Sequence, residues 1–449
     1  MPDPAADRLR SWERVGLALL TVLVVGLGAL TVVRSAFQSN PKTDFQVYAR
    51  AAWAVLAGED VYDVMDDNGW HYAYPPPFAV FLAPLASPYK FLPQDGYVPF
   101  AVSAGIWYAI SVAAAFYAVH AMAGAVLPGV RRGTRGWWWA RMVPLYVCAG
   151  GIGHTLGRGQ VNTVVVALAA AGFAAAVRNR RFAGGAWLAS AAVLKIIPTL
   201  LVLYPLARRD GRALAGAAAA VVALIGVVPA AVWGVDGAVA VNAKMVRVVL
   251  GPVFDKDGDQ TRAKELHAVT ATDNQSVQAA VQAWLHPDRA TRPDHADPAA
   301  KAAHLAVAGA MLLVTVWVGF RRLTPAPADQ LVYLGALFAL MTVASPVSHM
   351  HYYAFLLPLT AGLWLRSLAA RPGRLAADAR TTRMLIGWGI LTAVPLFPGP
   401  VFDRLRECGL GPVTTIALWA VGVAAIGRGR QADAAPAPHP LPQPLRRAA

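Results

Sequence analysis

The sequence predicts an all-α protein that crosses a lipid bilayer about 10 to 12 times. Of its 449 residues, 57% are hydrophobic and only 14% are charged, whereas about a quarter of the residues in soluble domains are charged. Apolar runs near the roughly 20 residues that span a hydrocarbon core recur along the whole chain. Together these features predict a polytopic helical membrane protein rather than a soluble domain.

Short clusters of basic residues between the apolar runs accompany the net charge of +15. Basic loops of this kind are typical of the cytoplasmic side of a membrane protein, and anionic lipid headgroups are their expected counter-charge. We therefore expect membrane lipids, and no nucleic acid, as partners. The clusters lie at residues 131–135, 178–181, 208–212 and 321–322.

Two of these clusters leave the topology between them open. Only 26 residues separate Arg181 from Arg208, too few for two full transmembrane helices. Either two short broken helices lie there, or one of the two clusters faces outward.

One membrane domain, residues 15–426, is expected between two cytoplasmic ends. The apolar run at residues 15–33 follows three arginines, which favours a cytoplasmic N-terminus over residues 1–14. The Ala/Pro-rich residues 427–449 are expected to form a disordered tail.

Two long polar segments, residues 35–77 and 235–300, are expected to be external loops. The first is rich in acidic residues, and the second contains a short amphipathic patch at residues 277–284. Apolar residues at helical spacing in the first segment predict an amphipathic helix on the membrane surface. These residues are Phe45, Tyr48, Ala52 and Val55.

Lys195 stands inside an apolar run, and Pro198 follows it three residues later. An ionisable residue within a membrane segment is costly and marks a candidate site, while the proline predicts a helix break. A lysine beside such a break could bind a phosphate or a carboxylate. The alternative is a lysine that reaches for the membrane edge, and the apolar residues on both sides leave it little edge to reach.

A short polar turn, Gly157-Arg158-Gly159-Gln160-Val161-Asn162, separates two further apolar runs. Its glycines would let a ligand approach the backbone closely, with Gln160 and Asn162 as candidate contacts. The alternative is a tight turn with a capping asparagine.

Another polar patch, from Ser345 to Tyr353, borders an apolar run and contains His349 and His351. Two histidines two residues apart could bind a metal, donate to an anion or shuttle a proton. A metal would need a third ligand, which no nearby spacing supplies, so contact with an anion or a substrate is favoured. The alternative is a pair of interfacial histidines that cap a helix.

Asp44 precedes the predicted surface helix, and Tyr74 precedes three prolines where the chain re-enters the membrane. Asp44 is well placed as a helix N-cap. A carboxylate at the boundary of water and lipid could instead deprotonate a sugar hydroxyl. Tyr74 would lie at the interface, as aromatic belts do.

Taken in order, these motifs resemble glycosyltransferase family 87, whose members are membrane mannosyltransferases of the GT-C superfamily. The resemblance covers residues 44 to about 358, and Ser348-His349-Met350-His351 departs from the family's more typical Ser-Trp followed by histidines. The motifs are Asp44-Phe45-Gln46-Val47-Tyr48, Gly58 with Tyr62-Asp63, Tyr74-Pro75-Pro76, Gly159-Gln160-Val161-Asn162, Leu194-Lys195 with Pro198, Asn274-Gln275-Ser276, and Ser345 to His351.

The resemblance implies a GT-C-type helical bundle with a polyprenyl-phosphate sugar, mannose expected, as the donor substrate. It implies Asp44 as the catalytic base, a glycolipid or glycan acceptor, and neither a metal nor another cofactor. Lys195 and His351, with His349 as second choice, are the expected contacts of the donor phosphate. The expected substrate-binding residues are Tyr48, Tyr74, Gln160, Asn162, Asn274, Gln275 and Ser348.

The expected location is the plasma (inner) membrane, with multiple spans and an active site that faces the extracytoplasmic side. Two other hypotheses fit the composition. A secondary transporter would also use broken helices around Lys195, and an envelope scaffold would explain the apolar bulk. The two halves show no convincing self-similarity, and the two long external segments and the expected disordered tail fit an enzyme better than a transporter. The polar residues gathered at the membrane boundary favour the enzyme over a scaffold.

Overall fold

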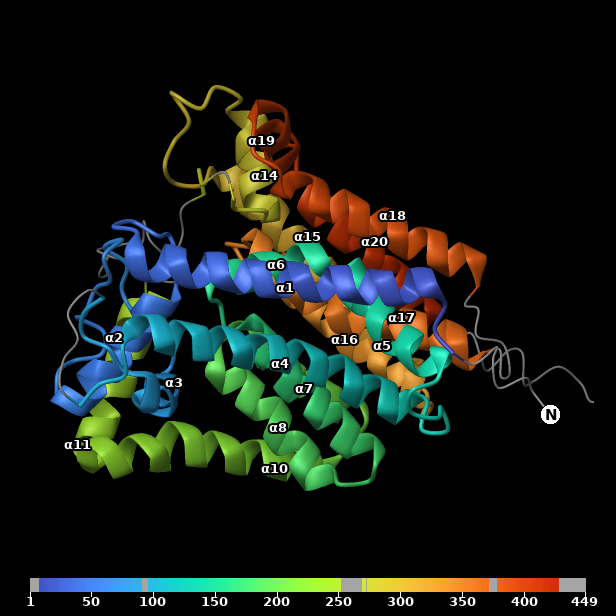
Figure 1. Cartoon of the computed structure of the whole chain (residues 1–449), viewed down its shortest axis with the longest axis horizontal. Helices are drawn as coiled ribbons and strands as arrows, with labels where there is room; N and C mark the ends of the chain where they lie inside the picture. Colours follow the sequence, from blue (N-terminus) through green and yellow to red (C-terminus); the bar gives the residue numbers. More distant parts are fainter. Residues whose placement is uncertain (1–7, 91–95, 252–268, 272, 371–377, 428–449) are drawn as a thin grey trace, which may run out of the picture.

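The structure is a computed structural model that describes residues 8–90, 96–251, 269–271, 273–370 and 378–427 (Figure 1). Throughout these ranges the regular elements are helices, and β-pairing is limited to two isolated bridges, so the predicted all-α class is confirmed. The α-helices are α1 (Ser11–Phe37), α2 (Phe45–Ala57), α3 (Pro76–Phe81), α4 (Phe100–Val126), α5 (Arg135–Val147), α6 (Ala149–Arg158), α7 (Asn162–Val177), α8 (Arg181–Leu194), α9 (Leu203–Ala207), α10 (Gly211–Val221), α11 (Val228–Met245), α14 (Val277–Leu285), α15 (Pro298–Arg321), α16 (Pro327–Ala344), α17 (Leu357–Ala369), α18 (Ala379–Ala393), α19 (Pro400–Glu407) and α20 (Leu410–Ala425).

Shorter helical turns connect several of these helices. The 3₁₀ turns are η1 (Ala83–Leu85), η2 (Ile197–Val202), η5 (Met350–Leu356) and η6 (Val394–Leu396), and the π turns are η3 (Val222–Val227) and η4 (Val246–Leu250).

Five helices of the described chain are long and apolar enough to cross a membrane. A sixth span results if the bent pair Ala379–Leu396 and Pro400–Glu407 counts as one, and Asn162–Val177, Ile197–Ala207 and Leu410–Ala425 are shorter apolar helices. The expected 10 to 12 spans therefore depend on short helices, which reach membrane depth only where protein shields their backbone. The five long helices are Ser11–Phe37, Phe100–Val126, Gly211–Val249, Pro298–Arg321 and Pro327–Ala344.

The long helices differ in how much of their surface the protein covers. In α1 and in Gly211–Val249 only 11% of the apolar window is buried, whereas in α16 it is 83%. Leu23 of α1, for example, is 68% exposed. Exposed apolar surface of this extent marks the faces that contact lipid, and α16 forms the centre of the bundle.

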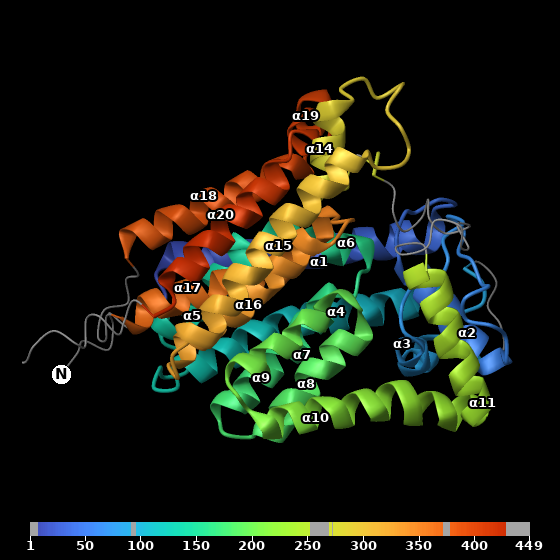
Figure 2. The same cartoon turned by 180° about the vertical axis from the view of Figure 1, so that it is seen from behind.

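The helices α7, α8 and α10 pack side by side along one edge of the molecule (Figure 2). Small residues permit this close packing: a β-carbon at Gly185 of α8 would lie only 1.7 Å from the carbonyl oxygen of Ala213 in α10. Glycine contacts of this kind let helix backbones approach each other in membranes. Beyond α10, the helix α11 is kinked at Gly234, which has a φ of 71°, and the chain turns a corner there (Figure 1).

The structure resolves the topology between the two arginine clusters. The helix α8 ends at Leu194, Lys195 has an extended backbone with φ −148° and ψ 125°, and η2 starts with Pro198 in its first turn. Arg181, at the start of α8, forms an ion pair of 3.9 Å with Asp210. After the break, the chain therefore returns to the side of the bundle where α8 begins. Two short broken helices therefore lie between the clusters, and the predicted break near Pro198 is confirmed.

The predicted helix at Phe45 is α2, but its surroundings correct one expectation. Its apolar side packs against protein, with the ring of Phe45 5.6 Å from that of Phe100 and the ring of Tyr48 5.0 Å from that of Phe78. Both Phe45 and Tyr48 are buried. The prediction that this apolar side lies on the membrane is wrong, because a periodic apolar face does not specify which apolar partner covers it.

The amphipathic patch at residues 277–284 is confirmed as the helix α14. Residues 235–250, at the start of the second predicted external loop, continue the helices α11 and η4. The first residues of the N-terminus and nearly all of the predicted disordered tail lie outside the described residues.

Candidate active site

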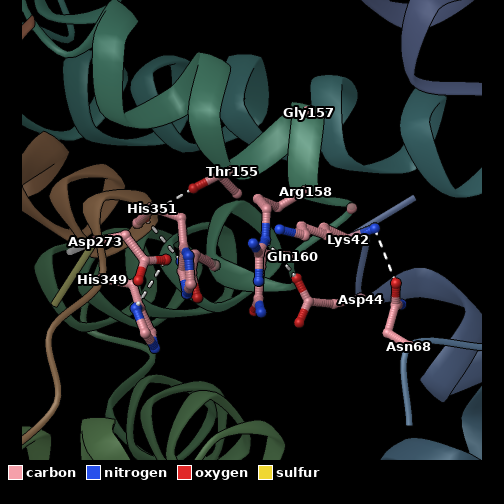
Figure 3. A network of polar contacts seen from close by, with 12 residues as sticks. Lys42, Asp44, Asn68, Thr155, Gly157, Arg158, Gln160, Asp273, His349 and His351 are labelled. Atoms are coloured by element: carbon pink, nitrogen blue, oxygen red, sulfur yellow. Dashed lines mark hydrogen bonds and ion pairs between the residues drawn. The ribbon is translucent and has the colours of Figure 1, made fainter. Parts of the chain in front are cut away.

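Three interruptions of apolar helices meet beside the start of α2 and form one polar cluster (Figure 3). They are the turn between α6 and α7, the break after α8, and the segment between α16 and α17 that contains η5. The backbone has to leave the helical conformation at each interruption, which aims polar side chains into the protein. In the turn between α6 and α7, Gly159 adopts a left-handed backbone conformation with φ 70°, which glycine tolerates because it has no β-carbon.

Asp44 is tied to this turn rather than to its own helix. It occupies the N-cap position of α2, but its side chain makes no capping hydrogen bond, so the capping alternative is wrong. Its backbone N–H donates to the carbonyl oxygen of Arg158 at 2.7 Å. The Arg158 Nε donates to its Oδ2 at 3.1 Å in an ion pair (Figure 3). The carboxylate therefore faces the end of α6.

Gln160 is the centre of the hydrogen bonds in the cluster. Its Oε1 lies 3.1 Å from the hydroxyl of Tyr48 and 2.9 Å from that of Tyr74, and the two hydroxyls are 2.9 Å apart. The ammonium group of Lys195 donates to the same oxygen at 3.3 Å. Two hydroxyls and one cation thus converge on a single amide oxygen, which joins α2, the α6–α7 turn and the α8 break.

Lys195 is 6% exposed and points into the protein, so the alternative that it reaches for the membrane edge is wrong. Its Nζ donates to Asn162 Oδ1 at 2.8 Å and lies 4.6 Å from the centre of the Tyr352 ring. The charge of Asp44 also attracts it. The buried cation is stabilised by hydrogen bonds and aromatic faces.

Asn162 connects the lysine to the histidine segment. Val161, not Asn162, occupies the N-cap of α7, so the proposed tight turn is confirmed while the capping role of Asn162 is wrong. Its Nδ2 donates to the carbonyl oxygen of His351 at 2.9 Å, and Thr155 Oγ1 donates to the same oxygen at 2.8 Å. The backbone of His351 is therefore held firmly beside Lys195.

Three histidine rings form a row next to these residues. The ring of His351 lies 6.0 Å from that of His154 and 5.4 Å from that of His349, and both pairs are stacked. His351 is 2% exposed, and its Nδ1 has no hydrogen-bond partner within the described structure. His349 precedes η5 without capping it, so the capping alternative is wrong here as well.

Asp273 is the second carboxylate of the cluster. Its Oδ2 lies 3.2 Å from His349 Nδ1 (Figure 3). Burial raises the pKa of Asp273, but the hydrogen bond and charge of His349, together with Arg158, outweigh burial and leave that pKa below its ordinary value. The carboxylate is therefore ionised at neutral pH.

Asn274, Gln275 and Ser348 join the loop before α14 to the loop before η5. Asn274 Oδ1 accepts from the backbone N–H of Ser348 at 3.1 Å, and the Gln275 N–H donates to the Ser348 carbonyl oxygen at 2.6 Å. These bonds place Asp273 beside His349. Contact of the three residues with a substrate stays a prediction.

The cluster also contains residues that sequence reasoning did not place in the site: Arg158, Asp273 and His154. Arg158 belongs to the glycine-rich turn, and His154 is an ionisable residue in an apolar run, so both carried a signal. Asp273 lies in a polar loop with other acids, and nothing in its local pattern distinguishes it. Among the described residues, no three His, Cys, Asp or Glu side chains form a group that could hold a metal ion, and metal independence stays a prediction.

The arrangement combines two carboxylates, a buried ammonium, a guanidinium and a row of imidazoles. A carboxylate can accept a proton from a hydroxyl, and cationic or N–H donors can stabilise negative charge that develops on a leaving group. The cluster therefore has the groups that acid–base chemistry on an anionic substrate requires.

Comparison with known proteins points to one family. The model of glycosyltransferase family 87 matches residues 72–346, more than half of the chain, and the model of YndJ-like protein matches residues 334–438. No curated protein matches the chain. One similar solved structure is ArnT from Cupriavidus metallidurans bound to undecaprenyl phosphate; it is 13% identical with a TM-score of 0.36, over 92% of this chain and 78% of ArnT. On the strength of the family model, the chain belongs to glycosyltransferase family 87.

Proposed function

We propose that this membrane glycosyltransferase moves a sugar, with mannose as the expected sugar, from a polyprenyl-phosphate donor to a lipid-linked or envelope glycan acceptor. One observation carries the proposal: Asp44 and Lys195 belong to the same cluster, with Arg158 and Gln160 of one turn between them. A candidate base thus lies beside cations suited to a phosphate, as a transfer from a sugar phosphate requires.

The proposed reaction is a single displacement. The acceptor oxygen forms a bond to the anomeric carbon of the sugar while its proton passes to Asp44. The bond between that carbon and the phosphate oxygen breaks, and its electron pair leaves with the phosphate. The products are the glycosylated acceptor, with inverted configuration at the sugar, and a polyprenyl phosphate. Lys195, His351 and His349 would stabilise the charge on the departing phosphate.

The position of the cluster along α7 and α8 supports an extracytoplasmic site. Both helices have the cluster at one end and the basic residues 178–181 at the other. At 1.5 Å per residue, α7 and α8 are about 24 and 21 Å long. Because basic loops favour the cytoplasm, the cluster would lie near the outer side of an inner membrane, where a lipid-borne phosphate is within reach.

A direct test incubates the purified protein with polyprenyl-phosphate mannose, labelled in the sugar, and a mixture of envelope glycolipids. We expect label in a glycolipid product, and loss of that product in Asp44→Asn. Asp63→Asn is the matched control, because Asp63 is an acid of the same loop whose carboxylate pairs with Lys244 away from the cluster. An Asp44→Asn variant with full activity would exclude Asp44 as the base.

The same assay separates this function from transport. Reconstituted liposomes that move a sugar across the bilayer without any covalent product would favour a transporter. No transfer from mannose or pentose donors on several polyprenyl phosphates would count against the proposed function as a whole.

A further inference from the structure

Arg158 has a feature that the proposed reaction does not yet use: only one of its five N–H donors, the one on Nε, is hydrogen-bonded to Asp44. Its Nε donates to Asp44 Oδ2 at 3.1 Å, and this is the one side-chain hydrogen bond that Arg158 makes within the described ranges. A guanidinium carries five N–H donors in a planar fork that matches a phosphate in two places. The resting contact with Asp44 uses only one edge atom of that fork.

We infer that Arg158 exchanges partners during turnover. In the resting protein it pairs with Asp44, and on arrival of the donor it moves to the phosphate, which frees the carboxylate to act as a base. The inference rests on the proposed function, because it needs an anionic donor. It makes Arg158 a positioning residue that couples donor binding to activation of Asp44.

The backbone around Arg158 is fixed, so an exchange would involve the side chain alone. The carbonyl oxygen of Arg158 accepts from Asp44 N–H at 2.7 Å, and Arg34 donates to the carbonyl oxygen of Gly157. The guanidinium lies 5.0 Å from the centre of the Trp70 ring. An aromatic face can support a guanidinium in more than one position in its plane, which suits a side chain that moves between two anions.

The charges around Arg158 favour such a movement once a phosphate is present. Asp44 lies on one side of Arg158, and Asp273 lies on the other side with His349 and His154. The charge of Asp273 interacts with the charges of Arg158, His349 and His154. Lys195 and His351, the proposed phosphate contacts, belong to the same cluster. A phosphate held by them would offer oxygens for two parallel N–H bonds, whereas Asp44 Oδ2 accepts only from Nε.

The exchange has a functional consequence. Without a donor, the charge of Asp44 is neutralised by Arg158, so the base is not available to an acceptor or to water. Donor binding would therefore precede productive deprotonation of the acceptor.

A double-mutant cycle on ligand binding tests the exchange. Undecaprenyl phosphate, a leaving lipid of the proposed reaction, is titrated against the purified full chain, and its affinity is measured by native mass spectrometry for wild type, Asp44→Asn, Arg158→Gln and the double variant. If Asp44 and phosphate compete for one guanidinium, Asp44→Asn tightens binding in the presence of Arg158 by about tenfold more than in its absence. Independent charges would give equal tightening in both backgrounds.

The outcomes are distinguishable. Equal tightening in both backgrounds overturns the exchange while leaving the proposed function intact. A wild-type protein that neither binds undecaprenyl phosphate nor transfers sugar contradicts the proposed function itself. If Arg158→Gln does not fold, Arg158→Lys replaces it in the cycle, and the extra tightening is expected to fall below about threefold because lysine has no fork.

A second Arg–Asp pair provides the matched control. Arg50 and Asp67 form an ion pair in the same external segment, and neither belongs to the cluster. The cycle with Arg50→Gln and Asp67→Asn is expected to leave lipid binding unchanged. A coupling as large as that of Arg158 and Asp44 would show a general effect of charge and would overturn the inference.

Discussion

Replacement of Lys195 by methionine tests the part of the site that handles the leaving phosphate. Methionine has a similar length and no charge, so Lys195→Met removes the ammonium while it largely fills the same space. The structure gives this ammonium hydrogen bonds to Asn162 Oδ1 at 2.8 Å and Gln160 Oε1 at 3.3 Å. Both belong to residues that are themselves held by the cluster, so the cation is preorganised.

The effect on catalysis should be much larger than the effect on folding. Removal of one preorganised donor to a developing negative charge costs about 2.7–4 kcal/mol of transition-state stabilisation, or about 10²–10³ in kcat. For folding, the variant leaves Asn162 Oδ1 without its donor, at about 1–3 kcal/mol, but it also removes a buried charge, which offsets part of that cost. We therefore expect a kcat reduced at least 100-fold and a Tm lowered by a few degrees.

The assay is sugar transfer from a polyprenyl-phosphate donor at saturating concentration, with Tm measured on the same samples. Lys244→Met is the control, because Lys244 is bound by Asp60 and Asp63 at 2.7 Å each on the exterior of the protein. Activity of Lys195→Met within about threefold of wild type would refute a role for Lys195 at the phosphate.

Two further predictions follow from the packing and the charges of the cluster. A β-carbon at Gly151 would lie 2.6 Å from the backbone of Tyr353 in η5, so Gly151→Ala should cost about 1–3 kcal/mol of stability and reduce activity. A β-carbon at Gly153 would meet nothing within 4 Å, so the control Gly153→Ala should leave stability and activity unchanged. Equal Tm values for the two variants would contradict this prediction. The pKa of Asp273 lies below its ordinary value of 3.8 because His349 and Arg158 outweigh its burial, so its stabilising effect is present above pH 3.8 and is lost as the pH falls through the folded-state pKa. The Tm difference between wild type and Asp273→Asn should therefore be present at pH 5 and close in stronger acid, and a difference that does not shrink in stronger acid would contradict this ion pair.

The elements of the fold were predictable where a local signal determined them. The apolar runs predicted helices, Pro198 predicted the break after α8, and the pattern at residues 277–284 predicted α14. The environment of α2 was not predictable, because hydrophobic periodicity reports an apolar face and not its partner. The number of spans was uncertain for a related reason: helices such as α7 are apolar but shorter than a full span.

Much of the site was predictable because polar residues inside apolar runs are costly and therefore conspicuous. Lys195, Gln160, Asn162 and His351 lie in one hydrogen-bonded path, as the shared motifs implied. The pairing of Asp44 with Arg158 was not predictable, since it joins residues 114 positions apart. Loop residues such as Asp273 become part of the site only through tertiary contacts, which a local sequence pattern does not encode.

The chemistry proposed for the cluster is one displacement at the sugar with Asp44 as the single base. The anomeric configuration of the transferred sugar, determined by NMR on product from a donor of known configuration, tests this most directly. Inversion is the predicted result, because the acceptor oxygen would attack from the face opposite the leaving phosphate. Retention would require a second displacement and would contradict the proposed reaction at this site.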